Sequence, residues 1–168
     1  MSSEIHVILE NYKTISIKSA TRKRRQGSVG QLCRIVSDEQ PLPEMKDFWN
    51  RTENKMSLQN CFVNYCATHY RSSKPLYIAG GLSEDPAKCS LIIDGNVTDV
   101  GNFRATHEEA DDRIMFCSIQ QINQRNTTSK TLTVVTSDTD IITVLLYHLK
   151  NTWTGTALYV LKKGRVKS

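Results

Sequence analysis

Residues 132–146 read LTVVTSDTDIITVLL, and this stretch decides the fold class. Its first part, residues 132–135, is an apolar and β-branched run typical of a buried strand, and its last part, residues 141–146, predicts a helix. Asp138 and Asp140 lie between the two parts, so we expect both at the carboxyl end of the strand. In open α/β sheets, ligands bind at that edge.

The same alternation of strand and helix extends along the chain. Further apolar runs predict strands at residues 5–9, 76–79, 91–93 and 157–161. Helical spacing of apolar residues predicts helices within 43–70, 107–124 and 139–149. Asp94-Gly95-Asn96 predicts a hairpin turn after residues 91–93. We therefore predict an α/β fold with a mainly parallel central sheet, flanked by helices on both faces.

Length and composition predict a single domain over residues 1–168. The chain has 168 residues, of which 39% are hydrophobic and 23% charged, and this composition excludes disordered, collagen-like and disulfide-scaffold classes. No apolar run approaches the ~20 residues of a membrane span, and residues 1–4 lack the pattern of a signal peptide. We expect an intracellular protein with no membrane partner. Its five cysteines, an odd number without a C-x-x-C pair, are expected to be free thiols.

A second group of acidic residues lies upstream of the first. Four carboxylates fall within five residues: Glu108, Glu109, Asp111 and Asp112. One interpretation is structural, because Thr106 and Glu109 have the spacing of a capping box at the start of a helix. Ser137 or Asp138 would cap the next helix in the same way. Capping explains one or two acids, but so many adjacent carboxylates repel one another.

The other interpretation is that the two acidic groups form one metal site. If the helix within 107–124 and the strand at 132–137 belong to one unit, both groups point to the same edge of the sheet. Crowded carboxylates stay ionised near bound cations, and oxygen ligands without sulfur suit Mg²⁺ or Mn²⁺. Two such ions ~4 Å apart can activate a water molecule and stabilise the leaving oxygen of a phosphodiester. The candidate catalytic residues are Asp111 and Asp138.

The order and placement of these acids resemble a known superfamily. Glu109-Ala110-Asp111-Asp112, followed after a helix by TSDTDI at residues 136–141, resembles the acidic motifs of the PIN-like and flap-endonuclease (5′ nuclease) superfamily. The longer string HEEADDRI at residues 107–114 is similar to that of poorly characterised, mobile-element-associated animal proteins with a nuclease-like domain. The resemblance implies metal-binding roles for the following residues: Glu10, Glu109, Asp111, Asp112, Asp138 and Asp140.

The resemblance also implies that the domain is incomplete. The family fold opens with a strand whose carboxyl end supplies another metal-binding Asp, and this chain begins after it. We therefore expect a PIN-like domain that is N-terminally truncated and lacks the first family strand. Residues 5–25 and 107–147 carry the likeness, and Glu108 falls outside the shared motif.

Basic residues are the candidate contacts for a substrate. The net charge is +5, with one basic run at Arg22, Lys23, Arg24 and Arg25 and a basic tail at residues 162–168. Such cations bind phosphates with salt-sensitive affinity, so the expected partner is nucleic acid, with DNA ahead of RNA. The alternative for the basic run is a solvated loop or a nuclear-localisation signal.

Three classes of function are compatible with these residues. The first is a nuclease that depends on Mg or Mn, with two ions if the site is complete. The second is a catalytically inactive remnant or nucleic-acid-binding module of the same fold. The third is another D-x-D enzyme, such as a haloacid-dehalogenase-like phosphatase or a sugar-nucleotide transferase. A phosphatase of that type needs Thr or Val where this chain has Ile142. The third class also leaves the acids at residues 108–112 unexplained.

Overall fold

The computed structural model describes residues 4–12, 30–35, 37, 39–82, 84–107, 109–124, 130–136 and 138–162. The chain divides into two compact units, Met1–Ala110 and Asp111–Ser168, which we call the first and the second unit. The expected single domain stays a prediction. Within the described ranges, no helix is both long and apolar enough to cross a membrane.

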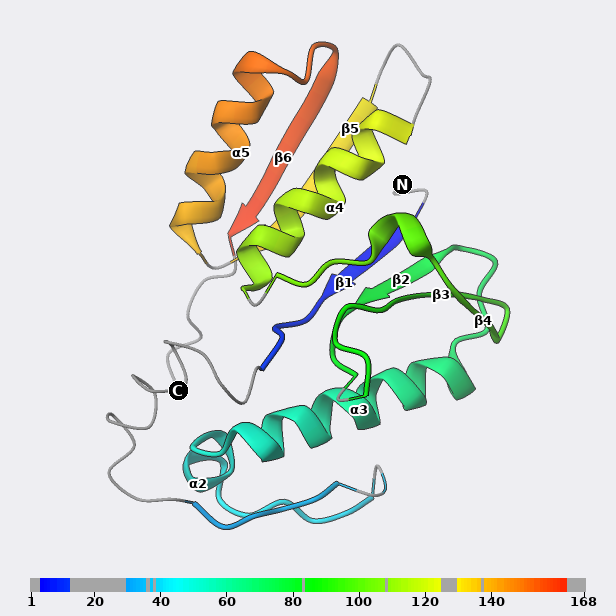
Figure 1. Cartoon of the computed structure of the whole chain (residues 1–168), viewed down its shortest axis with the longest axis vertical. Helices are drawn as coiled ribbons and strands as arrows, with labels where there is room; N and C mark the ends of the chain where they lie inside the picture. Colours follow the sequence, from blue (N-terminus) through cyan, green and yellow to red (C-terminus); the bar gives the residue numbers. More distant parts are fainter. Residues whose placement is uncertain are drawn as a thin grey trace. The chain divides into compact units, whose positions relative to one another are not determined.

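The first unit is built on a four-stranded sheet (Figure 1). Its order along the sheet is β1 (Ile5–Ile8), β2 (Leu76–Ala79), β3 (Cys89–Ile93) and β4 (Asn96–Asp99). Between β1 and β2 the chain forms α2 (Met45–Trp49) and α3 (Thr52–His69), and after β4 it forms the short 3-10 helix η1 (Gly101–Phe103). The predicted strands at residues 5–9, 76–79 and 91–93 are confirmed within a residue or two.

This sheet is mixed and not mainly parallel. β1 pairs with β2 in parallel, but β2–β3 and β3–β4 are antiparallel. The reason lies in the connections, because the predicted turn at Asp94-Gly95 joins β3 and β4 directly. Asp94 has φ 48° and Gly95 has φ 81°, as a tight two-residue hairpin requires. The expectation of a mainly parallel central sheet is therefore not confirmed.

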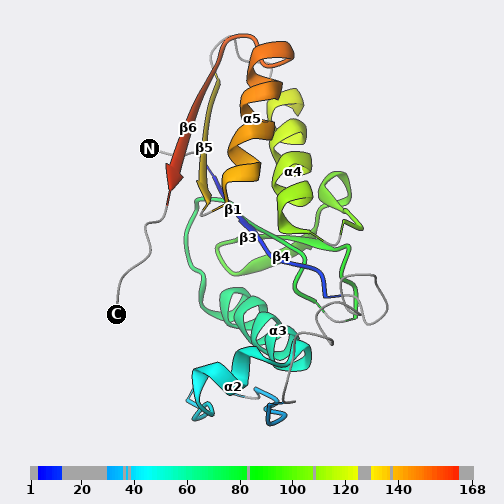
Figure 2. The ribbon, with the colours of Figure 1, turned by 90° about the vertical axis from the view of Figure 1, so that its left-hand side faces the viewer.

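The helix α3 covers one face of the four-stranded sheet (Figure 2). Val63 of α3 is buried in one cluster with Leu76, Ile78 and Ile92 from the strands. Alternate residues of β2 face this cluster, in keeping with the period of two along a strand. The parallel connection from β1 to β2 through α3 is thus held by an apolar core.

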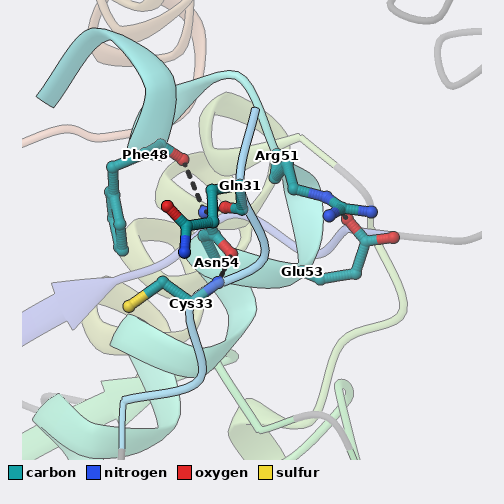
Figure 3. A network of polar contacts seen from close by, with 6 residues as sticks. All are labelled: Gln31, Cys33, Phe48, Arg51, Glu53 and Asn54. Carbon is teal, nitrogen blue, oxygen red and sulfur yellow. Dashed lines mark hydrogen bonds and ion pairs between the residues drawn. The ribbon is translucent and has the colours of Figure 1, made fainter. Parts of the chain in front are cut away.

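A buried asparagine attaches the chain before α2 to α3. Asn54 has no exposed surface, and its Oδ1 accepts a hydrogen bond from the backbone N–H of Cys33 at 2.8 Å. Its Nδ2 donates to the carbonyl oxygens of Gln31 at 3.0 Å and Phe48 at 3.2 Å. Figure 3 shows Asn54 between these three residues, with the Arg51–Glu53 ion pair at the start of the same helix. The Asn54 side chain therefore forms hydrogen bonds with the backbone of three residues, Gln31, Cys33 and Phe48.

The second unit contains a strand–helix–strand motif and one further helix. Its elements are α4 (Ala110–Gln124), β5 (Lys130–Thr136), α5 (Thr139–Asn151) and β6 (Thr156–Lys162). β5 and β6 form a two-stranded parallel sheet in which Lys130 pairs with Thr156 and Thr136 with Lys162. The strands and the helix predicted from residues 132–146 and 157–161 are confirmed.

Both helices of the second unit pack on one face of its sheet (Figure 2). Val134 of β5 is buried with Met115 and Ile122 of α4 and with Ile141 and Leu145 of α5. The opposite face carries Val135, Tyr159 and Leu161, whose side chains are 64%, 59% and 56% exposed. Among the described residues, helices thus cover one face of this sheet, where both faces were expected to be covered.

All five cysteines are free, as predicted. Cys89 and Cys117 are buried, whereas Cys33, Cys61 and Cys66 are half-buried. Burial raises the pKa of the Cys117 thiol to about 11, and the positive charge of Arg113 offsets a part of this effect.

Candidate metal centre

The upstream acids lie at the start of α4. The helix begins at Ala110, so Asp111 and Asp112 lie in its first turn and Glu109 directly precedes it. The predicted N-cap at Thr106 is wrong, because the helix begins at Ala110 and Thr106 lies four residues before it, not directly before it. The backbone N–H of Ala105 donates to the carbonyl of Ala87 at 3.0 Å, which holds the preceding chain in a non-helical path. Glu108 lies outside the described residues.

The downstream acids lie at the start of α5. Asp138 is the N-cap, and its Oδ1 accepts a hydrogen bond from the backbone N–H of Asp140 at 2.9 Å. Its own backbone N–H donates to Oγ1 of Thr136 at 3.0 Å, so the turn between β5 and α5 is fixed on both sides. The predicted capping role of Asp138 is therefore confirmed. The alternative cap, Ser137, lies outside the described residues.

The topology of the second unit brings both pairs of acids to one end. α5 starts at the carboxyl end of β5 because it connects that end to the start of β6. α4 precedes β5 by a short connection, so α4 ends near the amino end of β5 and starts at the opposite end. Figure 1 shows the first turns of α4 and α5 at the same end of the unit, beside the carboxyl ends of β5 and β6. We call Asp111, Asp112, Asp138 and Asp140 the acidic end.

The donor chemistry of the acidic end suits a hard divalent cation. All its ligand atoms are carboxylate oxygens, as Mg²⁺ and Mn²⁺ prefer. Asp112, Asp138 and Asp140 are exposed and Asp111 is half-buried, so solvent reaches the carboxylates. Nevertheless, among the residues that the structure describes, no three His, Cys, Asp or Glu side chains stand as a ready metal-binding group. The residues of the acidic end fit such an ion because their ligand atoms are carboxylate oxygens and because they lie at the same end of the second unit.

Two further predicted ligands belong to the first unit. Glu10 follows β1 and is half-buried, and its carbonyl oxygen accepts a hydrogen bond from Nε2 of Gln59 in α3 at 3.2 Å. Glu109 is half-buried near the end of the same unit. That Glu10 and Glu109 share a site with the acidic end stays a prediction.

One residue beside the acidic end was not singled out from the sequence. Arg113 follows Asp112 in the first turns of α4 and is only 1% exposed, the largest side chain among the fully buried ones described. A buried guanidinium is retained where charges of opposite sign compensate it. The effect of its charge that the structure shows is on Cys117, one turn further along α4, whose thiol pKa it lowers against the larger effect of burial. Its position four residues before buried Cys117, on the apolar side of the helix, was the available signal in the sequence.

The basic residues proposed as phosphate contacts lie elsewhere in the chain. Arg22, Lys23, Arg24 and Arg25 fall in the range 13–29, outside the described residues, as does the tail from 163 to 168. Their role as nucleic-acid contacts stays a prediction.

Comparisons with protein-family models, with curated proteins and with solved structures find no significant match for this chain.

Proposed function

We propose that this chain is a PIN-like, divalent-metal-dependent nuclease domain that hydrolyses phosphodiester bonds of nucleic acid. The single observation that supports this proposal best is the acidic end. Two pairs of aspartates from different parts of the sequence lie at one end of the second unit, where the parallel strands β5 and β6 finish. Function in α/β proteins concentrates at this edge.

The proposed roles follow from the positions of the side chains. Asp111 and Asp138 are the central ligands, with Asp112 and Asp140 beside them and Glu109 and Glu10 as further ligands. The N-cap hydrogen bond uses Oδ1 of Asp138 and holds its carboxylate in one orientation, so its second oxygen remains for a cation. Mg²⁺ or Mn²⁺ bound there would supply the Lewis acid that activates water and stabilises a leaving oxygen.

The finer fold assignment is part of this proposal. The β5–α5–β6 motif and the parallel pairing of β1 with β2 support a PIN-like arrangement. The antiparallel β3–β4 hairpin departs from a wholly parallel sheet. The family fold has a strand before the one that corresponds to β1, and β1 is the first strand among the described residues.

Nucleic acid is the proposed partner, with DNA ahead of RNA. The net charge of +5 favours a polyanion, and the basic run at residues 22–25 would contact its phosphates. Replacing Arg22, Lys23, Arg24 and Arg25 with Gln should weaken binding and reduce the slope of affinity against salt concentration. Binding is measured by fluorescence anisotropy over a range of salt concentrations, and an unchanged slope would exclude this run as a contact.

A cleavage assay tests the proposed activity. Purified chain is incubated with labelled flap DNA, single-stranded DNA and RNA, with Mn²⁺ or Mg²⁺ and with chelator. Asp138→Asn should abolish cleavage, because Asn keeps the helix cap but removes the charge. Glu53→Gln is the matched control, since Glu53 is an exposed carboxylate on α3 of the first unit. Cleavage that survives in Asp138→Asn would show a contaminant or another site.

A second function remains from the same fold, namely a nucleic-acid-binding module without activity. Two observations favour it: Asp138 already serves as a cap, and the described acids form no ready metal-binding group. Tight nucleic-acid binding without cleavage in either metal would support this module and contradict the nuclease.

A further inference from the structure

We draw no further inference here: the strongest candidate, the apolar face of the β5–β6 sheet that carries Val135, Tyr159 and Leu161, supports no proposal because nothing in the structure shows what covers it.

Discussion

At the scale of single residues, Asn54 joins α3 to the chain before α2 through its side-chain hydrogen bonds. It pairs with backbone groups of Gln31, Cys33 and Phe48, and all of its hydrogen bonds are shielded from water to some degree. Buried polar groups left without partners cost far more than an average hydrogen bond contributes. Asn54 therefore acts as a clamp between α3 and the extended chain at residues 30–35.

We expect Asn54→Ala to lower the free energy of unfolding by about 1–3 kcal/mol, because it leaves three backbone groups without partners. Urea unfolding followed by circular dichroism measures the change. Asn64→Ala is the matched control, since Asn64 is exposed on the same helix, and it should change the stability by less than ~0.5 kcal/mol. An equal loss in the free energy of unfolding for the two variants would contradict the stabilising role of the Asn54 hydrogen bonds.

Cys117 gives the second residue-scale prediction. Its folded pKa of about 11 lies above the ordinary value of 9.0, so the folded state favours the protonated thiol. This contribution to stability is fully present below about pH 9 and is lost as the pH rises toward 11. The wild-type chain should therefore lose stability over that range, and Cys117→Ser should lose less.

Pulsed alkylation with iodoacetamide at pH 8, followed by mass spectrometry, reports the same burial. Cys117 should react much more slowly than half-buried Cys61 in the native chain, and the difference should vanish in urea. Comparable native rates would show that Cys117 is accessible.

The sequence predicts site residues better than it predicts their partners. Asp138 was recognisable as a cap because its type and its place before an apolar helix identify that role. Asn54 was not recognisable, because a buried polar residue has the same letter as an exposed one, whereas the only signal for Arg113 was its place on the apolar side of α4. Only tertiary packing determines whether such a residue is buried or exposed.

At the scale of elements, the start of α5 combines a structural and a proposed functional role in Asp138. The two roles respond differently to substitution. Asn is as good an N-cap as Asp, whereas Ala removes the acceptor for the Asp140 N–H.

Asp138→Ala should therefore lower the free energy of unfolding by about 1 kcal/mol, and Asp138→Asn should leave it nearly unchanged. Thermal unfolding of both variants at low divalent-ion concentration measures this difference. If Asp138→Asn is as unstable as Asp138→Ala, the N-cap hydrogen bond does not stabilise α5.

The β3–β4 hairpin gives a second prediction at this scale. Gly95 has φ +81°, where an added Cβ costs about 1–2 kcal/mol, and that Cβ would also lie 2.5 Å from Nη1 of Arg71. Gly95→Ala should lower the stability by this amount in chemical unfolding. Asp94→Asn is the control, since Asn tolerates the positive φ of residue 94. A stable Gly95→Ala variant would contradict the tight-turn geometry.

Individual elements were predictable because their signals are local. Apolar runs of β-favouring residues located the five predicted strands, and the Asp94-Gly95 pair located the hairpin. The start of α4 was misplaced at Thr106 because its capping-box pattern is common. The competing hydrogen bond from Ala105 to Ala87 joins residues far apart in the sequence and leaves no local pattern.

At the scale of the whole molecule, strand direction was the least predictable feature. The alternation of strands and helices favoured a mainly parallel sheet. Parallel pairing is present between β1 and β2 and between β5 and β6. Between β2 and β3 the chain has only residues 80–88, and the described residues of this segment form no helix, so the strands return antiparallel. The shared end of the two acidic pairs was predictable, because it follows from the order α4, β5, α5 alone.

Divalent-ion binding tests the central claim most directly. Isothermal titration of Mn²⁺ into the full chain should show binding that Asp111→Asn combined with Asp138→Asn weakens at least about tenfold, because two ligand charges are lost. Glu53→Gln should bind like the wild type. Unchanged Mn²⁺ affinity in the folded double variant would contradict a metal site formed by the acidic end.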